Sequence, residues 1–186
     1  MAMPSPSWTA EELSRLPEDW RYEIDEGELV IMAPAGLKHG NTSVKVSSLL
    51  NAFVEQNRLG MVVSNDTGFR LQVAPEETLR APDVAFISKE RLARIADPKG
   101  FSEVPPDLAV EVKSASEFRV NMRRKVEQYL AAGVRSVWVL DPESRTLTQY
   151  LPDHNPAVYT GSATTIEDPV LPGLRCSLDE LFGEES

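Results

Sequence analysis

The chain has 186 residues, a formal net charge of −10 and a single cysteine, Cys176. This length is sufficient for one domain with its own hydrophobic core, and one cysteine excludes an internal disulfide and a cysteine-based zinc cluster. The acidic balance argues against tight non-specific binding of nucleic acid, because neutralisation of phosphates by basic side chains dominates such binding. The net charge does not exclude a local basic groove, or an acidic pocket that first recruits a divalent cation.

The first residues, Met1 to Ser7, have neither the basic segment nor the apolar segment of a signal peptide. No apolar run approaches the roughly 20 residues that span a membrane. We therefore expect a cytoplasmic protein with no membrane partner.

The predicted elements begin with a short helix, because Thr9 and Glu12 form the T-x-x-E pattern of a capping box. Residues 21–25 and 28–32 are expected to form two strands around a tight glycine turn. Glu23 lies within the first of these strands. We interpret it as a solvated acid on the outer face of the hairpin in preference to a functional group.

A helix is predicted over residues 39–57, where apolar side chains recur at three- and four-residue spacing. His39 at its start is more typical of an exposed or capping group than of a ligand. Shorter strands are expected at 61–63, 69–73 and 80–87. Pro82 cannot donate a backbone hydrogen bond, so it either begins the last of these strands or places it at a sheet edge.

Residues 106–114, PDLAVEVKS, indicate a buried strand that ends in an acid and a base. Side chains alternate along a strand with a rise of about 3.3 Å per residue, so Glu111 and Lys113 would share one face roughly 7 Å apart at their Cα atoms. An unpaired buried charge is costly. Either the strand end meets solvent with an incidental ion pair, or it forms a metal or phosphate site.

The remaining elements complete a mixed α/β pattern. A helix over 117–132 and a strand over 134–140 follow the buried strand, which predicts a right-handed parallel crossover. Later elements are expected at 145–151, near Val158, at 164–166 and from Ser177. We predict a single α/β domain, with a mixed central β-sheet flanked by helices.

Three charged residues form a constellation in this arrangement. Asp83 begins one strand, and Glu111 and Lys113 end another. Two carboxylates about 4 Å apart repel by about 4 kcal/mol at an effective dielectric constant near 20, and a divalent cation converts that repulsion into coordination. Mg²⁺ prefers carboxylates, water and phosphate oxygens. It lowers the pKa of a bound water, which Lys113 could orient.

The pattern Pro82-Asp83 … Glu111-Val112-Lys113 resembles the PD-(D/E)XK nuclease superfamily. An ordered set of blocks is also similar to the Uma family of bacterial putative restriction endonucleases: residues 21–29, 80–85, 106–114, 124–134 and 137–142. The resemblance implies a restriction-endonuclease-like core. We expect this core over about residues 20–151 of a single domain 1–186, with an N-terminal helical extension (1–19) and a C-terminal β/helix extension (152–186).

The same resemblance implies Mg²⁺-dependent hydrolysis of phosphodiester bonds, with Mn²⁺ as an alternative metal. Asp83 and Glu111 would hold the ion, and the carbonyl of Val112 would be a further ligand. We expect nucleic acid, specifically DNA, as the partner, and a homodimer as the assembly.

The resemblance leaves two lysines as catalytic candidates. Lys113 stands at the position of the catalytic lysine, but many relatives carry another residue there. For those, a helix lysine equivalent to Lys125 could serve, although a solvated helix lysine is an equal alternative. Tyr129 shares a helix face with Lys125 at i,i+4 and is an accessory candidate. Glu23 becomes a second accessory candidate.

Two other functions stay open. One is a non-catalytic or regulatory dimeric module of the same fold, which the acidic net charge favours. The other is a hydrolase of small phosphate esters, which needs no groove for nucleic acid. Arg119, Arg123 and Arg124 would form a basic rim if nucleic acid is the substrate, but a solvated charged helix face explains them as well.

Overall fold

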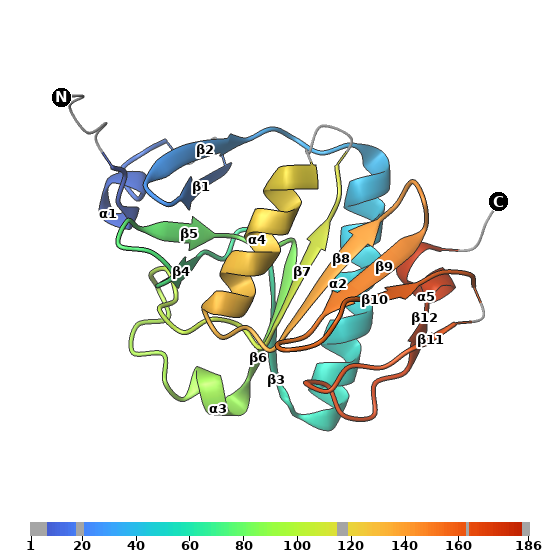
Figure 1. The fold of residues 1–186 in the computed structure, drawn as a ribbon. Coiled ribbons are helices and arrows are strands. Elements are labelled where there is room, and N and C mark those ends of the chain that lie inside the picture. The colour runs from blue at the N-terminus through green and yellow to red at the C-terminus, as the bar shows by residue number, and fades with distance from the viewer. Residues whose placement is uncertain (1–6, 18–20, 115–118, 163, 184–186) are drawn as a thin grey trace.

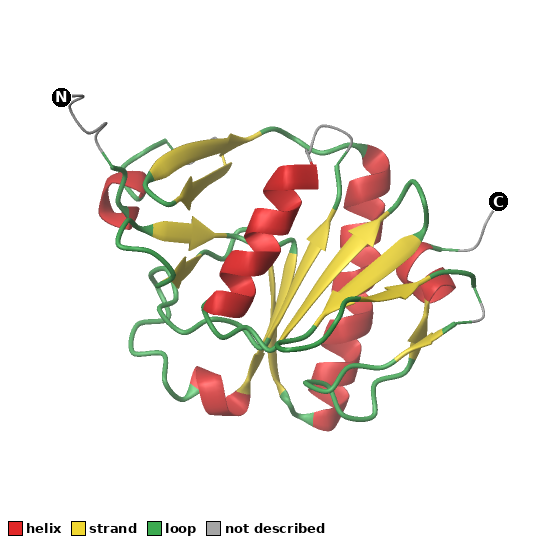
Figure 2. Ribbon diagram, in the orientation of Figure 1, coloured by secondary structure: helices red, strands yellow, loops and turns green. Residues whose placement is uncertain are grey.

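A mixed sheet of six strands forms the centre of the computed structural model, which describes residues 7–17, 21–114, 119–162 and 164–183 (Figures 1 and 2). The strand order is β10-β9-β8-β7-β6-β3. The parallel pair is β7–β8, as predicted, and the other neighbours are antiparallel. The strands are β3 (Gly60–Ser64), β6 (Val84–Ser88), β7 (Leu108–Val112), β8 (Ser136–Asp141), β9 (Thr146–Tyr150) and β10 (Ala157–Tyr159).

A second sheet of four strands, in the order β2-β1-β5-β4, lies beside the first. Its strands are β1 (Arg21–Asp25), β2 (Glu28–Met32), β4 (Phe69–Leu71) and β5 (Thr78–Arg80). The predicted hairpin is confirmed, with Asp25 paired to Glu28 across a two-residue turn. Both turn residues, Glu26 and Gly27, have positive φ angles of 48° and 83°. A type I′ turn requires this geometry because it matches the twist of the flanking strands.

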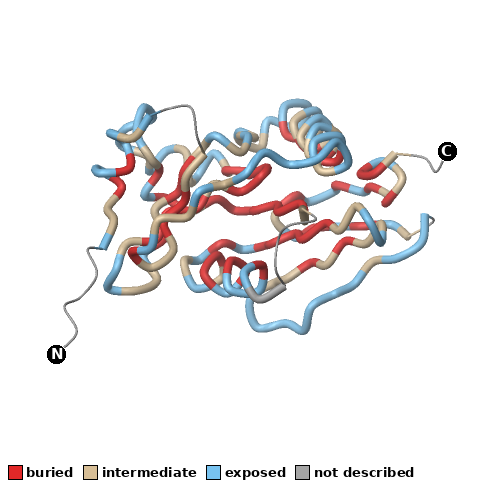
Figure 3. Tube along the Cα trace, turned by 90° about the horizontal axis from the view of Figure 1, so that it is seen from above, coloured by how far each residue is buried: buried red, intermediate tan, exposed pale blue. Residues whose placement is uncertain are grey.

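Two long helices cover opposite faces of the central sheet, α2 (Leu37–Asn57) and α4 (Arg119–Ala131) (Figures 1 and 3). The predicted start of α4 at residues 117 and 118 lies outside the described residues. The smaller elements are α1 (Ala10–Leu13), α3 (Lys89–Leu92), α5 (Leu178–Phe182) and the strand pair β11 (Thr165–Ile166) and β12 (Cys176–Ser177). In the part of the chain that the structure describes, no helix has the length and apolar character required to span a membrane.

The hydrophobic core is divided by the central sheet into two layers, as the two-residue period of a strand dictates. In β7, Val110 and Val112 pack with Val46 and Leu50 of α2. Ala109 lies in the other cluster, which holds Met122, Val126 and Tyr129 of α4. Glu111 follows the same alternation, so this acid is on the side of the sheet that α4 covers.

The prediction of one strand over residues 80–87 is wrong. The segment is divided into β5 and β6, which belong to the two different sheets. Pro82 lies at the break, where its missing N–H prevents a continuous ladder, and Ala81 donates its backbone N–H to the carboxylate of Glu23 instead. The break gives Asp83 the position directly before β6.

Candidate functional site

Asp83 and Glu111 lie where the start of β6 meets the end of β7. Asp83 directly precedes β6, whose antiparallel register with β7 pairs Val84 with Val110. The charge of Asp83 acts on the pKa of Glu111, so the two carboxylates are near each other. Both side chains are buried, with exposed fractions of 8% for Asp83 and 3% for Glu111. The structure therefore brings together the two acids that the sequence proposes as metal ligands.

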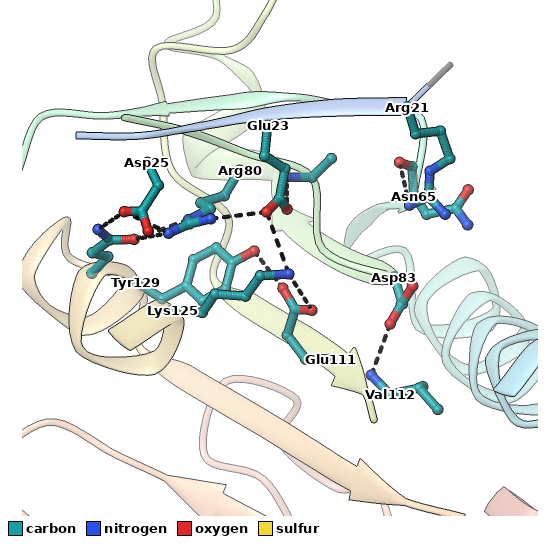
Figure 4. A network of polar contacts seen from close by, with 12 residues as sticks. Arg21, Glu23, Asp25, Asn65, Arg80, Asp83, Glu111, Val112, Lys125 and Tyr129 are labelled. Carbon is teal, nitrogen blue, oxygen red and sulfur yellow. Dashed lines mark hydrogen bonds and ion pairs between the residues drawn. The ribbon is translucent and has the colours of Figure 1, made fainter. Parts of the chain in front are cut away.

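Asp83 is held by a backbone donor, the N–H of Val112 (Figure 4), and by a histidine. Its Oδ2 accepts a hydrogen bond from the Val112 N–H at 2.8 Å, and His39 Nε2 lies 3.2 Å from the same oxygen. The hydrogen bond to Asp83 raises the pKa of His39. The interpretation of His39 as an exposed or capping group is wrong, because the first turn of α2 carries its ring to the start of β6.

Glu111 meets the buried face of α4. Lys125 Nζ lies 3.2 Å from Glu111 Oε2, and the Tyr129 hydroxyl donates to Oε1 at 2.7 Å. Lys125 is 5% exposed and Tyr129 is fully buried, so Lys125 is not a solvated helix lysine. Their i,i+4 spacing puts both on one helix face, and Figure 4 shows both directed at the strand.

Glu23 is the third acid in this group. It is 1% exposed, and its Oε2 lies 3.4 Å from Lys125 Nζ and 2.9 Å from Arg80 Nη1. The interpretation of Glu23 as a solvated acid is therefore wrong. Alternation along β1 shows which residues share a face, but it does not reveal that α4 lies against that face.

Arg80 is a buried residue of this group that the sequence reasoning missed. Its guanidinium is 3% exposed. In addition to Glu23, it pairs with Asp25 at 2.8 Å and donates twice to Gln128 Oε1, at 2.9 and 2.7 Å. An arginine directly before the Ala-Pro-Asp segment is the one signal that could have drawn attention to it. Arg80 therefore adds a buried positive charge beside Glu23 and Asp25, which Lys125 and Arg124 also contact.

Lys113 is placed differently from Lys125. Its Nζ lies 3.2 Å from Asp141 Oδ2 at the end of β8, and its side chain is 36% exposed. The strand β7 ends at Val112, so the alternation that would put Lys113 on the face of Glu111 does not extend to it. The structure brings Lys125 to Glu111 and does not bring Lys113 there.

A cavity of about 420 Å³ opens onto this group, within the size range of ligand sites. It is lined from both sheets and from α2 and α4, by residues that include Arg21, Glu23, His39, Arg80, Asp83, Glu111, Val112 and Lys125. Lys113 does not line it. All of the proposed metal-binding residues do.

The arginines of α4 that were predicted to form a basic rim are largely paired with acidic side chains. Arg124 lines the cavity but pairs with Asp25 at 3.2 Å and with Glu26 at 2.9 Å. Arg123 pairs with Glu127 at 2.8 Å. The side chain of Arg119 lies outside the described residues.

The chemistry of these donors fits a divalent cation that keeps water and substrate ligands. Among the described residues, no three His, Cys, Asp or Glu side chains are grouped closely enough to hold a metal ion on their own. Mg²⁺ is commonly bound by only one or two carboxylates, together with water and phosphate oxygens. Asp83 and Glu111 supply two carboxylates, and Val112, whose carbonyl would be the further ligand, lines the same cavity.

Burial raises the pKa of Glu111 to about 7, and the charges of Asp83 and Glu23 act in the same direction, against the opposing effect of Lys125. The folded protein therefore binds more protons than the unfolded chain between about pH 4.5 and 7. The stabilisation from this group is complete below about pH 4.5 and is lost as the pH rises through about 7.

We expect the wild-type protein to lose stability relative to Glu111→Gln when the pH is raised from 5 to 8, because glutamine does not titrate. Urea unfolding at both pH values measures the difference. Glu55→Gln, at an exposed position of α2, is the matched control and should show no such trend. A stability difference between wild type and Glu111→Gln that is constant with pH would contradict the raised pKa.

Comparison with known proteins decides the family. The model of the Uma2 family, described as "Putative restriction endonuclease", matches residues 10–179, which is most of the chain. The chain belongs to the Uma2 family. The predicted family is thereby confirmed, and with it a grouping among proteins described as nucleases. A comparison with curated proteins finds no match.

A solved structure supports the fold of this Uma2 family member. The crystal structure of a putative nuclease belonging to DUF820 from Anabaena variabilis ATCC 29413 superposes with a TM-score of 0.80. The alignment covers 94% of this chain and 97% of that chain, at 20% sequence identity. At this identity the likeness confirms the restriction-endonuclease-like α/β fold alone.

Proposed function

We propose that this protein is a metal-dependent endonuclease that hydrolyses phosphodiester bonds of nucleic acid, with DNA as the substrate. The observation that carries the proposal is that Asp83 and Glu111 are both buried and line one cavity, with Lys125 in contact with Glu111. Membership of a family described as restriction endonucleases supports the same reaction class.

In this proposal Asp83, Glu111 and the carbonyl of Val112 would hold Mg²⁺, with Mn²⁺ as an alternative. The bound ion supplies positive charge and acidifies water. Lys125, buried beside Glu111, places a further positive charge where negative charge develops on the phosphoryl oxygens. Such preorganised charge acts most strongly where water is excluded. Water adds to phosphorus, the P–O ester bond breaks, and the products are a phosphate monoester and a hydroxyl.

Cleavage of supercoiled plasmid in Mg²⁺, in Mn²⁺ and in EDTA tests the proposal directly. We expect nicked or linear product in the two metals and none in EDTA. A homodimer, with two sites related by a twofold axis, would also yield linear product and a doubled mass in solution. Hydrolysis of a small chromogenic phosphodiester without cleavage of plasmid or oligonucleotide would instead favour a phosphate-ester hydrolase. No cleavage of any of these substrates would overturn the proposal.

We expect Asp83→Asn to raise the Mg²⁺ concentration needed for half-maximal cleavage by about tenfold or more, since changes around a metal centre typically weaken its affinity by 10–100-fold. A metal titration of the initial rate measures the change. Asp153→Asn removes the same charge at an exposed turn and should leave the titration unchanged. Equal titration curves for the two variants would show that Asp83 does not hold the metal.

A further inference from the structure

Arg21 occupies the junction of two cavities. It begins β1 and shares a strand face with Glu23, by the alternation of side chains. It lines the cavity of about 420 Å³ that holds the two acids, and also an adjoining cavity of about 460 Å³. Glu23, Met32 and Ala81 line both as well, so the two cavities meet along this part of the molecule.

The guanidinium of Arg21 has donors to spare. Its Nη2 donates to the backbone carbonyl of Asn65 at 3.2 Å, which orients the group (Figure 4). Its Nε is buried and has no hydrogen-bond partner among the described residues. A buried N–H that stays unpaired is unusual, because leaving it so costs the full desolvation of the donor.

Arg21 differs in this respect from the other arginines of the first cavity. Arg80 and Arg124 both pair with carboxylates, whereas no carboxylate partner of Arg21 is found in the described parts of the chain. Among the residues that the structure describes, the site therefore contains one oriented arginine without a carboxylate partner.

The surroundings of Arg21 favour an anion. Its charge acts on His39 and lowers the pKa that Asp83 raises, so Arg21 lies near the His39–Asp83 pair. An arginine binds phosphate through a planar fork of two N–H groups, and the Arg21 side chain lines both cavities; its unpaired Nε–H would take part once the side chain turns toward the ligand. A phosphate here would sit at the edge of the proposed metal site without displacing a carboxylate.

The adjoining cavity offers a path along which a substrate chain can continue from the proposed metal site. Apolar side chains cover much of it, among them Leu13, Leu16, Leu79 and Phe101. A strand of nucleic acid has charged phosphates at regular intervals and apolar base faces between them. A chain that enters this cavity from the metal site must carry a phosphate past Arg21.

We infer that Arg21 binds a backbone phosphate of the nucleic acid adjacent to the phosphate that is cleaved. The inference rests on the proposed endonuclease function and names a substrate-binding residue of that site. Arg21 positions the substrate and does not take part in breaking the bond, so its removal weakens binding more than turnover.

The test is the kinetics of cleavage of a labelled oligonucleotide in Mg²⁺ by wild type, Arg21→Gln and Arg21→Lys. We expect Arg21→Gln to raise KM about tenfold with kcat changed far less, since charged hydrogen bonds are strong. The dependence of log(1/KM) on log salt concentration should become shallower by about 0.7–0.9, the contribution of one phosphate contact. Arg21→Lys keeps the charge and should keep the wild-type slope.

Arg175→Gln is the matched control, because it removes the same charge from an exposed residue that lines neither cavity and should alter neither KM nor the slope. An Arg21→Gln protein that cleaves with wild-type KM and slope overturns the role of Arg21 and leaves the endonuclease intact. A wild-type protein that cleaves nothing overturns both. If Arg21→Gln does not fold, Arg21→Lys decides: a raised KM at unchanged slope supports the role, and an unchanged KM overturns it.

Discussion

Lys125→Met should lower kcat for nucleic-acid cleavage by about 10²–10³-fold, the usual effect of removing one preorganised electrostatic group from an active site, whereas Lys113→Met should leave kcat within a few-fold. The reason is position. Lys125 Nζ lies 3.2 Å from Glu111 at the buried end of the cavity, and Lys113 pairs with Asp141 outside it.

Initial rates at saturating oligonucleotide and Mg²⁺ measure this difference, and thermal unfolding of both variants separates loss of fold from loss of rate. Lys113→Met is the matched control, because it makes the same substitution twelve residues earlier in the chain. If kcat falls further in Lys113→Met than in Lys125→Met, Lys113 and not Lys125 is the catalytic lysine.

Arg80→Met should destabilise the protein by about 3–5 kcal/mol, the typical loss when one partner of a buried ion pair is removed. Glu23 would be left 1% exposed with its closest arginine missing, and Gln128 would lose two donors. Urea unfolding near neutral pH measures the free energy. Pairing this change with Glu23→Gln should recover part of the loss, because the uncompensated charge is then absent.

Arg175→Met provides the comparison, since Arg175 and Glu167 form an ion pair with both side chains well exposed, at 71% and 63%. Exposed pairs of this kind contribute about 0–1 kcal/mol, so this variant should unfold close to wild type. Equal stability of Arg80→Met and Arg175→Met would contradict a structural role for the buried network.

Local sequence patterns predicted much of this fold because strands and helices follow from periodicity. The buried strand at Leu108–Val112, its parallel partner and the hairpin of β1 and β2 all agree with the expected alternation. The exception is residues 80–87, where a segment that the sequence presents as one strand changes sheet at Pro82. A period of two identifies an extended chain, but not the sheet to which it belongs.

The surroundings of the site were harder to predict than its two proposed metal ligands. Asp83 and Glu111 come from a recognisable spacing, whereas the burial of Glu23 and Lys125 and the contact of His39 with Asp83 depend on elements distant in the chain. A polar residue in an amphipathic element is expected to be exposed unless another element packs over it. Here α2 and α4 pack against the central sheet (Figure 1) and bring these polar residues into the site.

The single carboxylate of Glu23 has a consequence for how variants of this protein should be interpreted. Its Oε2 lies 2.9 Å from Arg80 Nη1 and 3.4 Å from Lys125 Nζ. The same oxygen therefore contacts a residue of the structural network and a residue proposed for catalysis. A Glu23 variant would therefore confound two phenotypes, inactivity and misfolding. For the same reason, evolutionary change at this position would be constrained twice, and tolerated exchanges there should be accompanied by changes at Arg80 or Lys125.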